Sequence, residues 1–229
     1  MRTKQHKVKF HIYNLDHLVS EKTVQKHGPL FPNSIRAIIC GPSNCGKSNV
    51  MMSMLYSPDG LKFANLYVYS KSLHQPKYQL LENILNEVNG VRFHSFKEND
   101  EIMEPSEAER NSVFIFDDIG SSKQEKIRDF FSMGRHSDVD SFFLIQSYTR
   151  ALKHMVRDNA NFLILFKQDE LNLRRVYNDH VSSDMKFEEF KSLCMECWKE
   201  KYGFITICKD FDSSDGRYRM GMDRYIYPE

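Results

Sequence analysis

Short apolar segments alternate with helical patterns through the middle of the chain. The segments that fit buried strands are 35–40, 66–69, 91–95, 113–116, 141–145 and 161–166. Helices fit the segments 47–56, 78–87 and 124–133, of which the second is clearly amphipathic. Strands that alternate with helices favour parallel pairing through right-handed crossovers. The pattern therefore predicts an α/β fold, with a mostly parallel sheet and helices on both of its faces.

The pattern changes near both ends of the chain. Residues 7–13 alternate polar and apolar side chains and predict a short strand. Near the other end we expect helices at 169–180 and 187–202, strands at 204–208 and 225–227, and a polar turn over 210–217. We therefore divide the chain into an N-terminal lead-in (1–33), a core (34–168) and a small α+β C-terminal appendage of the same domain (169–229).

Composition narrows the classes of protein to consider. The 229 residues can bury about 70% of the unfolded chain's surface on folding, which favours one or two domains. Lys and Arg total 32 against 31 Asp and Glu, so a generally basic nucleic-acid-binding surface is excluded, although a local patch is not. No apolar run approaches a membrane span, and the basic N-terminus lacks the apolar core of a signal peptide. We expect an intracellular protein without a membrane anchor, whose five cysteines are reduced thiols.

A phosphate-binding loop follows the first core strand. The segment from Gly41 to Ser48 matches G-x-x-x-x-G-K-[ST], with an apolar strand before it and a helix after it. Glycines permit the tight turn, and backbone N–H groups at the helix N-terminus form an anion nest. Lys47 would reach the β- and γ-phosphates, and the Ser48 hydroxyl would bind Mg²⁺. The expected nucleotide-binding residues are Gly41, Pro42, Ser43, Asn44, Cys45, Gly46, Lys47, Ser48 and Asn49.

Two adjacent carboxylates end the strand at 113–116. In doubly wound sheets ligands lie at the carboxyl ends of strands, so we expect Asp117 and Asp118 to face the phosphate loop from a neighbouring strand tip. Asp117 would hold Mg²⁺ through its water shell. Asp118 would orient or deprotonate the attacking water. Together with the loop, this pair predicts an enzyme that binds ATP and Mg²⁺.

Several classes of nucleotide enzyme share this loop. GTPases need an N-K-x-D motif for base recognition, and the sequence has none. Small-molecule kinases usually carry an arginine-rich lid, whereas the adjacent pair Arg174 and Arg175 lies far downstream on a predicted helix. The class that remains is the oligomeric motor or helicase.

At this point the chain resembles the FtsK–HerA superfamily of P-loop ATPases. Within it, the resemblance is to the short genome-packaging ATPases of poxvirus-like and adenovirus-like viruses, virophages and Maverick/Polinton elements. The matching segments span about residues 30–170 and are 41–48, 113–118, 134–136, 142–147 and 157–167. One departure is that many relatives have Asp-Glu where this chain has Asp117-Asp118, and the shorter Asp118 must reach the water with one methylene fewer.

The resemblance implies further roles and partners. It implies a RecA/FtsK-like P-loop NTPase fold, with Gln146 as a sensor of the γ-phosphate at the end of the strand beside the phosphate-loop strand. Arg135 would enter the site of the neighbouring subunit, with Arg150 and Arg157 as rivals for that role. The implied protein is a homo-oligomeric ring that hydrolyses ATP, binds double-stranded DNA regardless of sequence and moves it into a capsid. A capsid or portal protein would be its partner, in the host cell (virus factory, cytoplasm or nucleus) or associated with the virion.

Two alternative functions stay open. One is another FtsK–HerA-type DNA translocase, and the other is a nucleotide-binding virion scaffold that does not hydrolyse ATP. A weaker signal is the C-x-x-C at Cys194 and Cys197, which could bind a metal together with Cys208 and His180. The two cysteines also share one apolar helical stripe with Phe187, Phe190 and Trp198, so we interpret them as buried core residues.

Overall fold

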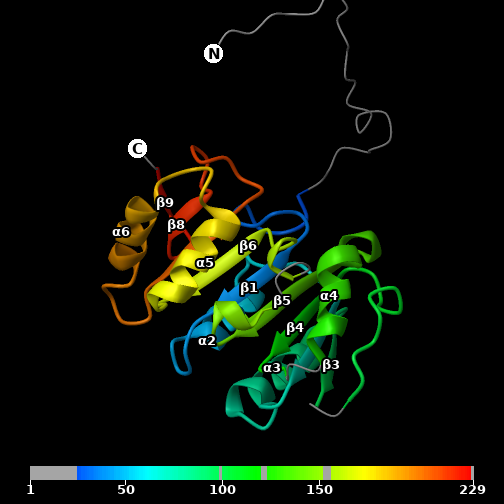
Figure 1. Ribbon diagram of the computed structural model, residues 1–229. Helices are drawn as coiled ribbons and strands as arrows, with labels where there is room; N and C mark the ends of the chain where they lie inside the picture. Colours follow the sequence, from blue (N-terminus) through cyan, green and yellow to red (C-terminus); the bar gives the residue numbers. More distant parts are fainter. Residues whose placement is uncertain (1–24, 98–99, 120–122, 152–155, 228–229) are drawn as a thin grey trace, which may run out of the picture.

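The computed structural model describes residues 25–97, 100–119, 123–151 and 156–227. Within these residues, nine strands form one sheet in the order β3-β2-β4-β5-β1-β6-β7-β8-β9 (Figure 1). The strands are β1 (Arg36–Cys40), β2 (Asn65–Ser70), β3 (Arg92–Phe96), β4 (Ser112–Asp117), β5 (Val139–Ile145), β6 (Phe162–Phe166), β7 (Phe204–Cys208), β8 (Tyr218–Met220) and β9 (Arg224–Ile226). The helices are α2 (Lys47–Tyr56), α3 (Pro76–Glu87), α4 (Gln124–Met133), α5 (Glu170–His180), α6 (Phe187–Cys197) and the short 3₁₀ helices η2 (Gly134–Ser137) and η3 (Tyr148–Arg150).

Helices cover both faces of the sheet. Successive side chains of a strand point to opposite faces, and β1 shows this alternation over its whole length. Ile38 and Cys40 belong to a core cluster that includes residues of α4, α5 and α6. Ala37 and Ile39 belong to a second cluster that includes residues of α2 and α3. The structure thus confirms the predicted α/β fold with helices on both faces of the sheet (Figure 1).

Six strands run parallel, and their order decides which residues meet at the carboxyl edge of the sheet. β1 pairs with β5 on one side and β6 on the other, while β4 pairs with β5. The strand that ends in Asp117 is therefore one strand removed from β1, and our expectation of a neighbouring strand is wrong. Strand spacing places the two strands roughly 10 Å apart. Local sequence pattern cannot reveal this because it carries no information on which strands pair.

The last three strands extend the same sheet with antiparallel pairing. β7 pairs with β6, and β8 and β9 follow in order. β8 lies where we expected no strand between the polar turn and the last strand, which corrects the sequence prediction. The predicted strand at 7–13 lies outside the described residues, and the division of the chain at 33/34 and 168/169 stays a prediction.

The helix predicted at 187–202 ends earlier, at Cys197. Trp198 caps it outside the helical conformation, and its indole N–H donates a 2.9 Å hydrogen bond to the Leu165 carbonyl in β6. The chain then turns toward β7 through Gly203, where a Cβ would lie 2.1 Å from the Cys197 carbonyl oxygen. This turn brings residues 198–203 beside the carboxyl end of β6 and, as shown below, beside the phosphate loop.

Candidate functional site

The loop between β1 and α2 depends on two glycines. The Gly41 amide donates a 3.1 Å hydrogen bond to the carbonyl of Ile145, which ties the loop to the end of β5. A Cβ on Gly41 would lie 2.6 Å from both Cys45 Sγ and Phe166 Cβ. Gly46 has a φ of 112°, which side chains rarely tolerate. The motif therefore needs glycine at 41 because Cys45 and Phe166 lie too close for a side chain, and at 46 because the backbone is left-handed.

The helix that follows this loop has a free N-terminus suited to an anion. Gly46 is its N-cap and provides no side-chain hydrogen bond, while the first N–H groups of a helix have no partner within it. The Lys47 ammonium lies over the loop, 2.7 Å from the Gly41 carbonyl oxygen and 3.0 Å from that of Pro42. A cleft of about 400 Å³ opens here, lined by Asn44, Gly46, Lys47, Ser48, Asn49, Lys77 and Tyr202. Backbone donors, a helix dipole and two lysines make this cleft chemically suited to a polyanion such as a triphosphate.

Asp117 is a buried carboxylate at the end of β4. It is 9% exposed, and the Tyr78 hydroxyl on α3 donates a 2.5 Å hydrogen bond to its Oδ2. Burial raises the pKa of Asp117 above its ordinary value, against the effects of the Tyr78 hydrogen bond and of the charges of Lys77 and Lys47. Lys47 thus acts on Asp117 across the intervening strand, and the two groups belong to one site.

Sequence analysis missed Lys77 and Tyr78. Both lie in the first turn of α3, which follows β2 at the same edge of the sheet as the phosphate loop. The available signal was their position at the start of the helix that follows a parallel strand, because polar residues there can face the ligand edge of the sheet.

Asp118 and Gln146 come together at the same edge. Both are exposed and line a cavity of about 90 Å³, together with Arg150 of η3. Asp118 has a φ of 56°, a left-handed backbone conformation, directly after the end of β4. Asp and Asn adopt this conformation more readily than most residues. A carboxylate and an amide in one small cavity can hold a water molecule between them.

The three candidate arginines lie in different surroundings. Arg135, in η2, is exposed and lies at the opposite edge of the sheet, near Arg36 at the start of β1. Burial lowers the pKa of Arg36, and the nearby charge of Arg135 lowers it further. Arg157 is 4% exposed and forms a 3.1 Å ion pair with Asp179. Only Arg150 of the three lies with Asp118 and Gln146. Arg135 therefore cannot reach the phosphate loop of its own subunit, and the buried pairing of Arg157 suits a structural role.

The residues expected to bind magnesium offer suitable ligands. Mg²⁺ prefers oxygen atoms, usually one or two carboxylates with waters and phosphates. Ser48 supplies a hydroxyl on the wall of the phosphate cleft, and Asp117 supplies a carboxylate whose pKa responds to Lys47. This donor set fits a hydrated Mg²⁺ bound to a triphosphate.

The cysteines form no metal site in the part of the chain that the structure describes. No group of three or more His, Cys, Asp or Glu residues there could hold a metal ion. Cys194 and Cys197 are buried on α6, in the core cluster with Phe190 and Trp198, as we interpreted them. Burial raises the pKa of Cys197 to about 11 and also raises that of Cys45 in the phosphate loop. Both thiols therefore stay protonated near neutral pH, as expected of packing residues.

No helix among the described residues is long and apolar enough to cross a membrane.

Comparisons with known proteins bear on the fold and the family. A family model described as "Poxvirus A32 protein" matches residues 26–225. The genome packaging NTPase B204 from Sulfolobus turreted icosahedral virus 2 is similar in several complexes. Its complex with sulfate has a TM-score of 0.53 at 13% identity, over 85% of this chain and 98% of that one. Its complex with AMP has a TM-score of 0.52 at 12% identity, over 79% of this chain and 95% of that one. Its complex with ATP-gammaS has a TM-score of 0.51 at 13% identity, over 86% of this chain and all of that one.

At such identities the likeness shows a shared fold, that of a P-loop NTPase. No curated protein matches the chain.

Proposed function

The chain belongs to the Poxvirus A32 protein family, and from this premise we propose that it is an ATP-driven translocase that packages double-stranded DNA into a viral or virus-like capsid. The observation that carries the proposal is the meeting of three groups at one edge of the sheet. These are the phosphate loop after β1, Asp117 at the end of β4, and Gln146 directly after β5. The fold shared with the genome packaging NTPase B204, which is known in complex with sulfate and with ATP-gammaS, supports the same assignment.

ATP hydrolysis would use the two aspartates and the glutamine in separate roles. The loop amides and Lys47 bind the phosphates, since they form the wall of the anion cleft. Asp118 orients or deprotonates the attacking water in the cavity that it shares with Gln146. Gln146 can contact that water and the γ-phosphate, and it directly follows β5, which pairs with β1 and β4. A change at Gln146 on hydrolysis would therefore pass to the centre of the sheet.

Magnesium would be held by Ser48 and, through water, by Asp117. A divalent ion bound there neutralises charge on the phosphoryl oxygens during transfer.

The active form would be a homo-oligomeric ring. Arg135 lies exposed at the far edge of the sheet, so it can serve a phosphate loop only in another subunit. A cation that reaches the transferring phosphoryl group from a neighbour is worth on the order of 10³-fold or more in rate. DNA would be bound through its phosphates, so binding should weaken steeply with salt. A capsid or portal protein is the expected further partner, in the infected cell or the virion.

Two alternatives are separable from this proposal. A different FtsK–HerA-type translocase would share the site but not the capsid partner. A scaffold that binds nucleotide without hydrolysis would need none of the groups around Asp118. The cavity that joins Asp118 to Gln146 and Arg150 favours an enzyme over such a scaffold.

The test is ATP hydrolysis by the purified full chain, with and without linear duplex DNA. We expect phosphate release that DNA stimulates. Asp118→Asn should lower the hydrolysis rate by about 100-fold or more while ATP binding is kept. Asn also tolerates the left-handed backbone of Asp118, so the fold should be unaffected.

Asp138→Asn is the matched control for that variant. Asp138 also has a left-handed backbone, with a φ of 57°, but it lies at the opposite edge of the sheet, just before β5. The control should hydrolyse ATP at the wild-type rate. A wild-type chain that binds ATP and shows no hydrolysis under any of these conditions would overturn the proposal in favour of the scaffold.

A further inference from the structure

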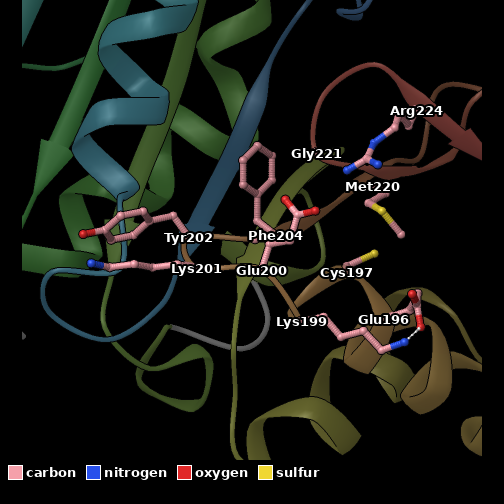
Figure 2. A pocket seen from close by; sticks show the side chains of 11 residues that line it. Glu196, Cys197, Lys199, Glu200, Lys201, Tyr202, Phe204, Met220, Gly221 and Arg224 are labelled. Atoms are coloured by element: carbon pink, nitrogen blue, oxygen red, sulfur yellow. Dashed lines mark ion pairs between the residues drawn. The ribbon is translucent and has the colours of Figure 1, made fainter.

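Tyr202 reaches the phosphate cleft from the C-terminal part of the chain. It lies in the turn between α6 and β7, and it lines the cleft together with Ser48 and Asn49. Its Cβ would be 3.8 Å from a Cβ placed on Gly46. Figure 2 shows the Tyr202 side chain pointing away from α6 toward the loop between β1 and α2. A segment beyond the predicted core thus forms one wall of the nucleotide cleft.

The backbone and exposure of Tyr202 are unusual for an aromatic residue. Its φ of 67° is left-handed, which for a bulky side chain is a rare and costly conformation. Its side chain remains 57% exposed, so burial of the ring does not offset that cost. A backbone hydrogen bond stabilises the turn that carries Tyr202, because the Gly203 amide donates to the Glu200 carbonyl at 3.0 Å. Strain of this kind concentrates at ligand-binding sites.

The surroundings of the ring suit the nucleoside end of a nucleotide. Tyr202 lines the phosphate cleft and also a second pocket of about 330 Å³, which lies between the segment 196–204 and the β8–β9 turn. The Lys201 Nζ is 5.0 Å from the centre of the Tyr202 ring (Figure 2). A flat ring beside the phosphate loop offers a stacking surface that any base can use, because every base has a π-face.

We propose that Tyr202 is the base-stacking residue of the nucleotide site, with the base of ATP lying against its exposed ring while the triphosphate lies on the loop. This inference rests on the proposed function, since it assumes that the loop binds a nucleoside triphosphate. It assigns a ligand contact to the C-terminal appendage, which then completes the site instead of only extending the sheet.

The test compares two ligands by calorimetry: ATP, and inorganic tripolyphosphate, which lacks the base and sugar. The variant is Tyr202→Gly, because glycine accepts the left-handed backbone without strain. Loss of stacking should weaken ATP binding between about 5-fold and about 150-fold. Tripolyphosphate binding should stay unchanged, and the melting temperature should not fall. Tyr202→Trp should keep or improve ATP affinity.

Tyr227→Gly is the matched control, since Tyr227 is 62% exposed and lies beyond β9. Tyr227 lines neither of these two pockets. It should bind both ligands as the wild type does. The inference is overturned if Tyr202→Gly weakens both ligands equally, which would indicate a role in loop structure, or if it weakens neither. A wild-type chain that binds neither ligand would instead overturn the proposed function, and the stacking role with it.

Discussion

The Tyr78 hydroxyl donates a 2.5 Å hydrogen bond to Oδ2 of Asp117, and so joins α3 to the acidic end of β4. Burial raises the pKa of Tyr78 as well as that of Asp117, so the phenol stays protonated and can only donate to a charged carboxylate. Because this bond favours the charged form of Asp117, it acts against the effect of burial. We therefore predict that Tyr78 positions the proposed metal ligand.

Tyr78→Phe removes this hydrogen bond and leaves the ring in place. The pKa of Asp117 should rise further, so the acidic limb of the ATPase pH profile should move toward neutral pH. Affinity for Mg²⁺ should fall by about 10-fold, as is usual when a partner of a metal ligand is lost. The measurement is the rate of ATP hydrolysis against pH at several Mg²⁺ concentrations.

Tyr177→Phe is the control for this variant, because it also removes one hydroxyl, which donates to the Met185 carbonyl on the α5 side of the molecule. Its pH profile should match the wild type. If Tyr78→Phe shows the same acidic limb of the pH profile and the same Mg²⁺ dependence as Tyr177→Phe, then Tyr78 does not influence the pKa of Asp117.

The sequence predicts well those features that depend on residues close together in the chain. Helix α2 and strand β7 begin and end where we expected, and so does α4. The phosphate loop could be recognised because its chemistry depends on residues within one turn. The structure explains both glycines of the motif. Gly46 has a left-handed backbone, and Gly41 closely approaches Phe166.

The missed features depend on contacts between distant segments. β8 has three residues, and its central Arg219 is fully buried, with its guanidinium 5.0 Å from the Phe211 ring centre and 5.4 Å from that of Tyr225. A charged residue in so short a segment looks like part of a polar turn. Tyr78 and Tyr202 reach the site through strand order and through the turn after α6. Neither of these has a signature in the local pattern.

Gly46→Ala should impair both folding and nucleotide binding. The φ of 112° at Gly46 is poorly accessible to alanine, and the added Cβ would lie 3.3 Å from the Phe166 ring. We expect a loss of about 1–2 kcal/mol in unfolding free energy. ATP affinity should fall at least 10-fold, since the loop amides would no longer converge on the phosphates. Denaturant melts and calorimetry measure the two effects.

Gly90→Ala separates the two effects. Gly90 also has a left-handed backbone, with a φ of 83°, but a Cβ there would meet nothing within 4 Å. It should lose a similar amount of stability and keep wild-type ATP affinity. Equal losses of ATP affinity in both variants would mean that global stability, and not loop geometry, controls binding.

Asp140 should stabilise the fold at the edge opposite the site. It is 1% exposed and accepts hydrogen bonds from the Ile35 amide at 2.7 Å and the Lys26 ammonium at 2.8 Å, and its carboxylate is 3.0 Å from His27 Nε2. Burial would raise the pKa of Asp140, but the His27 hydrogen bond and the Lys26 charge outweigh burial and hold it below 3.8. The charged form is thus favoured by folding, and its contribution is present above pH 3.8 and lost as the pH falls through the lower folded-state pKa.

Asp140→Asn should therefore lower the unfolding free energy by about 3 kcal/mol at neutral pH. The difference from the wild type should shrink below pH 3.8, where the wild type loses the same charge. Asp138→Asn, at a side chain that is 37% exposed and also pairs with Lys26, should cost about 1 kcal/mol or less. Urea melts at neutral and acidic pH decide this, and a difference that stays constant with pH would contradict the charge argument.

The positions of Arg135 and Arg150 predict opposite results when inactive subunits are mixed. Lys47→Ala subunits have no working phosphate loop of their own but still supply an arginine to a neighbour. If Arg135 acts across the interface, Arg135→Ala subunits mixed equally with them should regain activity at about a quarter of the interfaces of a closed ring. Arg150 lies with Asp118 and Gln146 of its own subunit, so Arg150→Ala subunits should regain none. Cross-linking must first show that mixed rings form. Recovery with Arg150→Ala, and none with Arg135→Ala, would transfer the role in the neighbouring site to Arg150.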